Sequence, residues 1–173
     1  MNSTSSSHNE QLQNQQLQNQ QLVRNLFEAV VNRGDVDCVD EVLSADCVDH
    51  NPGPSDAPGR AGIREVFMLL HTAFPDLHGS IDDLLCDRDF VIVRWTIGGT
   101  NTHRCMGIGP TNRRMKNHGI DIVRVENGRI VERWGNSDDL KTLEQMGLLQ
   151  DVMSCPDFNP HSHDSFVVQA LQS

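Results

Sequence analysis

One carboxylate in the sequence stands inside a stretch that is otherwise largely apolar. Asp121 lies between Ile120 and Ile122, at the start of a run to Val125 that is dense in β-branched residues. Such residues suit a pleated, half-buried surface, so the run predicts a β-strand. A carboxyl group in apolar surroundings has a raised pKa, which a general base near neutral pH requires. Asp121 is therefore the first candidate for proton-transfer chemistry.

The alternation of side chains along a strand gives Asp121 a direction. It shares one face with Gly119, Val123 and Val125, whereas His118 lies on the opposite face. If the Asp121 face lines a cavity, the carboxylate acts as a general base. If Asp121 pairs with an arginine or caps a backbone N–H, its role is structural. The sequence favours neither interpretation over the other.

Removing a proton next to a carbonyl group also needs donors for the developing enolate. Three polar side chains are candidates for that role: His50, His103 and Asn136. His50 has the strongest case because it directly precedes a loop, where functional side chains collect, although it would serve equally well as a cap of that loop. We predict Asp121 and His50 as catalytic residues, and His103 and Asn136 as substrate-binding residues.

The two tryptophans, Trp95 and Trp134, fall on the two long predicted strands. An indole can pack in a core and also form the wall of a cavity, so we predict both as substrate-binding residues. Tyrosine is absent from the chain, which leaves acid–base chemistry to Asp, Glu, His and backbone groups.

The first elements that must position these residues are helices. Apolar residues spaced three and four apart predict helices over Leu22–Arg33 and Ala61–Phe74, with a shorter helix between them. Gly34 and Pro75 end the two longer helices. Asp138 is placed to cap a last short helix that ends at Gly147.

Strands occupy the middle and the second half of the chain. The period changes to two over Leu77–Leu85 and Phe90–Gly99, and a hairpin within Arg114–Ser137 turns at Asn127-Gly128. Helices followed by antiparallel strands predict an α+β fold, a cone-shaped barrel in which a curved antiparallel sheet wraps the N-terminal helices and encloses a pocket.

The two ends of the chain differ in composition from this domain. Met1–Gln21 is rich in Gln and Asn, and its leucines recur every five residues, which matches neither a helix nor a coiled coil. We predict a disordered tail over residues 1–21, one domain over 22–149 and a C-terminal tail over 150–173.

Composition excludes several classes of partner. The formal net charge is −10, with 24 acidic and 14 basic residues and no basic cluster, which argues against nucleic acid and anionic membranes. No run is long enough to span a bilayer, and the polar N-terminus favours a cytoplasmic protein.

Five scattered cysteines without a C-x-x-C pair indicate reduced structural thiols. His161-Ser162-His163-Asp164 has metal-ligand spacing but no third cluster, so we assign no metal.

Five motifs, in this order, make the stretch from Leu22 to Leu149 resemble the SnoaL-like polyketide cyclase family, part of the nuclear-transport-factor-2-like group of cone folds. They are HNPG (His50–Gly53), GRAGIREVF (Gly59–Phe67), RWTIGGT (Arg94–Thr100), MGIGPTNRR (Met106–Arg114) and GIDIVRVENGRIVERW (Gly119–Trp134).

The resemblance implies a deep apolar pocket, assembly as dimers or tetramers, and intramolecular aldol ring closure of a polyketide-like carbonyl compound without metal or organic cofactor. Asp121 matches the family's general acid/base, and His50 matches the histidine of its HNP motif. Trp95 and Trp134 match aromatic positions on the long strands. The expected partner is a small apolar molecule that contains a carbonyl group.

Two other functions stay open, because one fold hosts many activities. An epoxide-hydrolase-like enzyme needs a second carboxylate and an arginine converging with Asp121 on one water, with Asp83 and Arg94 as candidates. A non-catalytic binding protein uses the pocket only to hold a ligand.

Assembly follows from a different feature. Ile120 and Ile122 on the convex face of the sheet predict that a second copy of the chain covers it.

Overall fold

The computed structural model describes residues 3–53, 55, 57–104 and 109–148, and helices lie at both ends of this described part. The helix α1 (Ser3–Phe27) runs into a π-helical turn, η1 (Glu28–Asn32). Three further helices follow: α2 (Cys38–Val42), α3 (Gly59–Ala73) and α4 (Asp139–Met146). Gly34 and Gly147 have the left-handed backbone expected at helix ends, and the Asp138 carboxylate accepts the Lys141 N–H at 3.2 Å as the predicted cap of α4.

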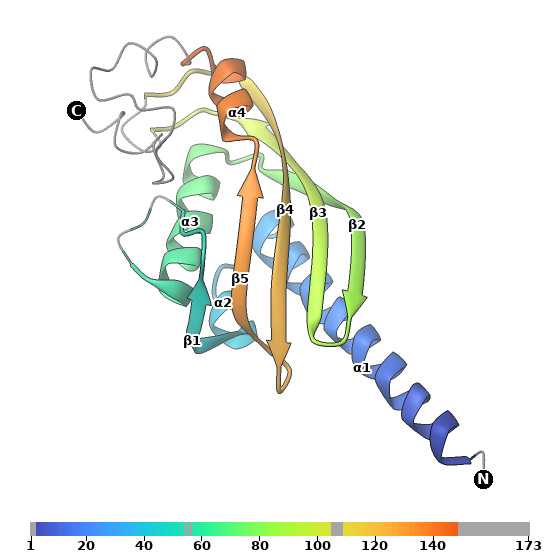
Figure 1. Cartoon of the computed structure of the whole chain (residues 1–173). Helices are drawn as coiled ribbons and strands as arrows, with labels where there is room; N and C mark the ends of the chain where they lie inside the picture. The colour runs from blue at the N-terminus through green and yellow to red at the C-terminus, as the bar shows by residue number, and fades with distance from the viewer. Residues whose placement is uncertain (1–2, 54, 56, 105–108, 149–173) are drawn as a thin grey trace.

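A single five-stranded sheet forms the other layer (Figure 1). Its strands are β1 (Leu43–Asp49), β2 (His78–Asp87), β3 (Phe90–Thr100), β4 (Arg114–Glu126) and β5 (Arg129–Ser137), in the order β1-β5-β4-β3-β2. Neighbouring strands are antiparallel, except that β1 pairs with β5 in parallel. The α+β class is confirmed. The four predicted strands are present, and the parallel strand β1 is an addition that the strand pattern did not predict.

The hairpin β4–β5 turns where the sequence predicts, because Asn127 and Gly128 adopt positive φ values of 51° and 74°. One irregularity interrupts it. Arg124 pairs with Glu132 and Val125 pairs with Ile130, so Val131 is an extra residue on β5. A bulge of this kind shifts the pairing register, and every side chain of β5 beyond it changes face relative to a regular hairpin.

The sheet has an inner face, which packs on the helices, and an outer face, which does not. Figure 1 shows α1, α2 and α3 behind the sheet and α4 at its upper end. The inner face carries buried residues of the core: Val91, Val93, Ile97, Met115, Val123, Val125 and Ile130. The outer face carries exposed apolar side chains: Leu85, Phe90, Ile92, Ile120 and Ile122.

The N-terminal segment differs from the disordered tail that we expected over residues 1–21. From Ser3 onward it belongs to α1, whose first half extends past the sheet (Figure 1). Asn19 anchors the helix, since its buried amide donates to the Arg88 carbonyl at 3.3 Å and accepts from Gln15. The expected tail over 150–173, with His161–Asp164, lies outside the described residues. No helix among those described is long and apolar enough to cross a membrane.

Candidate active site

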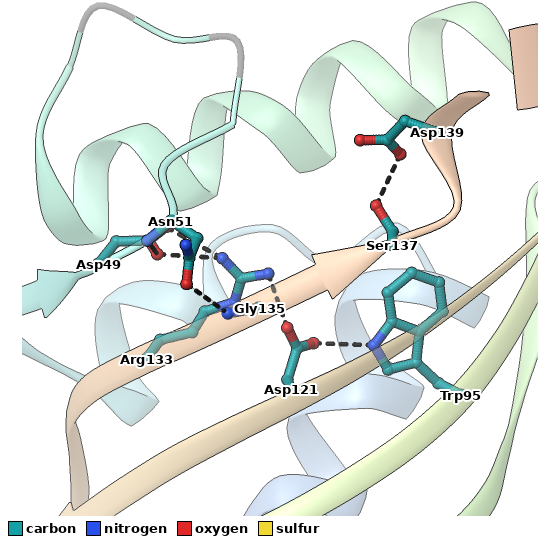
Figure 2. Close-up of polar contacts among 8 residues, drawn as sticks. All are labelled: Asp49, Asn51, Trp95, Asp121, Arg133, Gly135, Ser137 and Asp139. Carbon is teal, nitrogen blue, oxygen red and sulfur yellow. Dashed lines mark hydrogen bonds and ion pairs between the residues drawn. The ribbon is translucent and has the colours of Figure 1, made fainter. Parts of the chain in front are cut away.

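Asp121 lies on the inner face of β4, as the alternation predicts, with each carboxylate oxygen hydrogen-bonded. The Trp95 indole Nε1 donates to Oδ2 at 2.9 Å, and Arg133 Nη2 donates to Oδ1 at 2.8 Å (Figure 2). These partners come from the two strands that flank β4, namely β3 and β5. The structure therefore shows the arginine pairing of the second interpretation at an interior position, and the cavity that the first interpretation requires remains a prediction.

Gly135 makes this arrangement possible on β5. It lies directly opposite Asp121, and a side chain built there would overlap Arg133 Nη2 and Asp121 Oδ1. The missing side chain leaves the space in which the guanidinium crosses from β5 to the carboxylate. A glycine next to Arg133-Trp134 is thus part of the site, a role that the sequence pattern alone did not indicate.

Arg133 also binds a second carboxylate, Asp49, at the end of β1. Its Nη1 lies 3.1 Å from both oxygens of Asp49, whose side chain is only 4% exposed. Asn51 fixes this corner, since its backbone N–H donates to Asp49 at 3.2 Å and its side-chain oxygen accepts from the Gly135 N–H at 3.3 Å (Figure 2). One guanidinium therefore lies between two carboxylates.

Opposing effects act on the pKa of the Asp121 carboxyl. Burial raises the pKa of the Asp121 carboxyl above its usual value, since 19% of the side chain is exposed and the charged form is poorly solvated. The Arg133 charge and the hydrogen bonds from Trp95 and Arg133 oppose this rise, whereas the negative charge of Asp49 adds to it. Burial prevails, which is the direction that a general base needs.

Three of the predicted site residues lie on the outer face, away from Asp121. Because Arg133 points inward, Trp134 points outward, and Asn136 follows it on that side, opposite the exposed Ile120. The His50 ring stacks on Trp134 with centroids 4.4 Å apart, and its Nε2 lies 2.9 Å from Glu132 Oε2. His50, Trp134 and Asn136 thus share a face with one another and not with Asp121. For Trp134 and Asn136 the physical reason is the bulge at Val131.

His103 lies in the loop after β3. Its Nδ1 is 3.0 Å from the Thr102 hydroxyl, and its carbonyl accepts from the Asn101 amide at 2.9 Å. These contacts hold the loop and leave the role of its imidazole a prediction. Residues 105–108, which follow it, are outside the described part of the chain.

Arg94 and Asp83, the predicted partners for epoxide chemistry, also face outward. Arg94 Nε donates to Asp83 at 2.7 Å, and Arg94 pairs across the strands with the exposed Ile120. The carboxylate and arginine that do converge with Asp121 are Asp49 and Arg133. Neither was predicted, because no local pattern shows the bulge that turns Arg133 inward or the pairing of β1 with β5 that brings Asp49 to it.

Two hollows lined by described residues lie away from Asp121. The larger, of about 560 Å³, lies between α1 and the β4–β5 turn and is lined by Asn19, Leu22, Asp89 and Glu126 among others. The smaller, of about 350 Å³, lies between α1 and β2. The predicted apolar pocket around Asp121 therefore remains a prediction.

A curved sheet on N-terminal helices with an interior carboxylate is typical of a class of small α+β proteins. Comparison with known families identifies the family within this class. The model of the SnoaL-like polyketide cyclase family matches residues 21–146, so this chain belongs to that family. No curated protein matches it significantly.

Solved structures agree with this assignment. The chain is 33% identical to IdmH from Streptomyces antibioticus, a candidate polyketide cyclase, over 75% of this chain and 98% of that one, with a TM-score of 0.65. It is 28% identical to TsrD from Streptomyces laurentii, over 77% and 97%, with a TM-score of 0.69. AclR from Streptomyces galilaeus, a candidate hydroxylase, is 24% identical over 76% and 97% with a TM-score of 0.68, and shows the fold alone.

Proposed function

We propose that this protein is a cyclase or isomerase in which Asp121 acts as general acid and base on a small, apolar, polyketide-like molecule that contains carbonyl groups. One observation carries the proposal. The Asp121 carboxyl lies on the inner face between two donors, with its pKa raised by burial. Membership of the SnoaL-like family supports the same type of chemistry.

The reaction proceeds in three steps within one substrate molecule. Ionised Asp121 removes a proton from a carbon next to a carbonyl group. The electron pair left on that carbon forms a C–C bond to a ketone carbon of the same molecule. The ketone oxygen then takes the proton back from Asp121. The product is an isomer of the substrate, so the balance requires no oxidant, reductant or leaving group.

The donors nearest to Asp121 are Trp95 Nε1 and the Arg133 guanidinium, at 2.9 and 2.8 Å from its oxygens. The single N–H of Trp95 is taken by Asp121 Oδ2, whereas Arg133 keeps N–H groups beyond those that bind the two carboxylates and has donors for a developing enolate. We assign this role to Arg133 instead of to His50 and Asn136, which face the other way. Each Asp121 oxygen accepts one described bond and retains a lone pair for the substrate.

The test is Asp121→Asn, which keeps the shape of the side chain and removes the base. The probe is a 1,3-dicarbonyl ester with a ketone placed for ring closure, and both turnover and affinity for the cyclised product are measured. We expect a loss of about a hundred- to ten-thousand-fold in rate with product still bound. Asp83→Asn, on the outer face, is the matched control. If the wild type does not convert the probe and Asp121→Asn only alters the affinity for the product, the protein is a binding protein instead.

Epoxide opening is the second candidate, and the Asp49–Arg133–Asp121 arrangement favours it. One carboxylate takes a proton from water as the water oxygen attacks an epoxide carbon. The C–O bond breaks, and the other carboxyl group, when protonated, gives its proton to the epoxide oxygen. The test is conversion of cyclohexene oxide in ¹⁸O-water. A diol that carries one labelled oxygen, and that Asp121→Asn no longer forms, would select this activity over cyclisation.

A further inference from the structure

An arginine next to a general base creates a conflict. A guanidinium in contact with a carboxylate favours the ionised form and weakens it as a base. Arg133 Nη2 lies 2.8 Å from Asp121 Oδ1, in a site where only about a fifth of the Asp121 side chain is exposed. If Asp121 were the only partner of Arg133, the ion pair would hold the carboxylate in its ionised state.

Asp49 is the group that resolves this conflict. Both of its oxygens lie 3.1 Å from Arg133 Nη1, on the other side of the same guanidinium. Strand pairing fixes this contact, because Asp49 lies opposite Arg133 in the parallel pair of β1 and β5, and the Asn51 N–H holds Oδ1. The Asp49 side chain is 4% exposed, so its charge is little screened by water.

We propose that Asp49 is a positioning residue for Asp121: it holds Arg133 on its far side and balances the guanidinium charge, so that Arg133 orients Asp121 without fixing it as a permanent ion pair. This inference rests on the proposed function, since it explains how a carboxylate that touches an arginine remains a usable base. It gives Asp49, the last residue of β1, a role in the chemistry in addition to its role in the fold.

Two charged groups of the described chain have the largest effects on Asp121. They are Arg133 on β5 and Asp49 on β1, and Trp95 on β3 contributes an uncharged donor. The Cys47 thiol of β1 is also sensitive to Asp49 and Arg133, but burial, helped by the Asp49 charge, raises its pKa to about 11 and keeps it neutral. Asp49 and Arg133 therefore decide the charge balance.

The direction of the effect of Asp49→Asn follows from this balance. The asparagine oxygen can still accept from Arg133, so the contact survives, but the negative charge that offsets the guanidinium is gone. The Arg133 charge then acts undiminished on Asp121 and favours its ionised form. We expect the midpoint of the Asp121 titration to move to lower pH by about one unit.

Trp95 provides a direct reporter of this titration that needs no substrate. Its indole N–H donates to Asp121 Oδ2, and the chain contains only two tryptophans, so two indole signals are expected in a ¹H–¹⁵N spectrum. Trp134→Phe assigns them. The experiment follows the Trp95 signal from pH 3 to 8 in the wild type, in Asp49→Asn and in Asp121→Asn, which must abolish the titration.

The control is Asp46→Asn, which removes a charge from the same strand at an exposed position and should leave the midpoint in place. If Asp49→Asn does not fold by circular dichroism, Asp49→Ser makes the same charge change with a smaller side chain. A midpoint that stays or rises in a folded Asp49 variant overturns the proposal, as does a Trp95 signal that does not titrate in the wild type.

Turnover separates this inference from the proposed function. An active enzyme whose rate is lost in Asp121→Asn, together with an unmoved midpoint in Asp49→Asn, would overturn the role of Asp49 alone. A shifted midpoint in a protein that converts neither probe would support the charge balance and overturn the proposed activity. If the role of Asp49 were purely structural, Asp49→Asn would lower stability and leave the midpoint of the Asp121 titration where it is.

Discussion

Gly119 of β4 lies directly opposite Trp95 of β3, and the indole ring rests on the backbone where a side chain would otherwise begin. A methyl group at Gly119 would overlap three atoms of that ring. The bare backbone therefore leaves room for the indole, whose Nε1 reaches Asp121, two residues further along β4. Gly119 and Gly135 thus provide the space for the two donors of Asp121.

Gly119→Ala should displace the indole and break its hydrogen bond to Asp121. Overpacking of this kind typically costs about 1–3 kcal/mol of stability, which urea unfolding measures. The Trp95 indole signal should move and lose its dependence on Asp121. Gly109→Ala is the control, because nothing lies within 4 Å of a side chain built there. An unchanged indole signal in Gly119→Ala would contradict this account of the site.

The pH dependence of stability should reveal which force prevails at Asp121. Because burial raises its pKa in the folded state, folding favours the protonated form. That contribution is complete below the unfolded pKa of about 3.9 and is lost as pH rises through the folded pKa. The stability of the wild type relative to Asp121→Asn should therefore fall as pH rises from about 4. A rise over the same range would show that the Arg133 ion pair dominates and that Asp121 is a structural anchor.

The outer face should be covered by a second copy of the chain. Its exposed side chains include Ile120 at 49% and Leu85 at 64%, and an apolar sheet face of this kind is a common interface. We expect a dimer in sedimentation velocity at micromolar concentration, and a folded monomer for Ile120→Glu. Leu140→Glu places the same charge at an equally exposed position on α4 and should leave the dimer intact. A monomeric wild type would refute the interface.

Asn19 should contribute to the stability of the fold although it lies in a glutamine-rich segment. Asn19→Ala removes the buried amide that donates to the Arg88 carbonyl, a loss of about 1–3 kcal/mol in urea unfolding. Asn25→Ala, on the exposed side of α1, removes only a bond to Gln21 and should cost much less. Equal effects of the two changes would mean that the first part of α1 does not depend on this anchor.

The helices, the four antiparallel strands and the inward direction of Asp121 were predictable because each follows from a local period. The Asn127-Gly128 turn was predictable for the same reason, since few residues tolerate positive φ. The segment before Leu22 was not, because the contact that anchors α1 is made by an amide, Asn19, and an apolar pattern does not detect it.

The partners of Asp121 depended on two features that no local pattern shows. A regular hairpin would have set Trp134 opposite Asp121, but the extra residue Val131 sets Gly135 there and turns Arg133 inward. The parallel pairing of β1 with β5 brings Asp49 to the same guanidinium from 84 residues away. Between Trp95 and Asp121 the pairing of β3 with β4 is regular, and the predicted role of Trp95 in substrate binding stays a prediction.

The parallel pairing of β1 with β5 also has a consequence for the fidelity of folding. A slip of β1 by one residue would turn Val48 or His50 inward and carry Asp49 to the opposite face. Arg133 would then lose the carboxylate that balances it, so a misaligned edge strand carries an electrostatic penalty in addition to lost packing. If Asp121 is the base that we propose, correct alignment of the edge strand and the competence of Asp121 arise together in assembly.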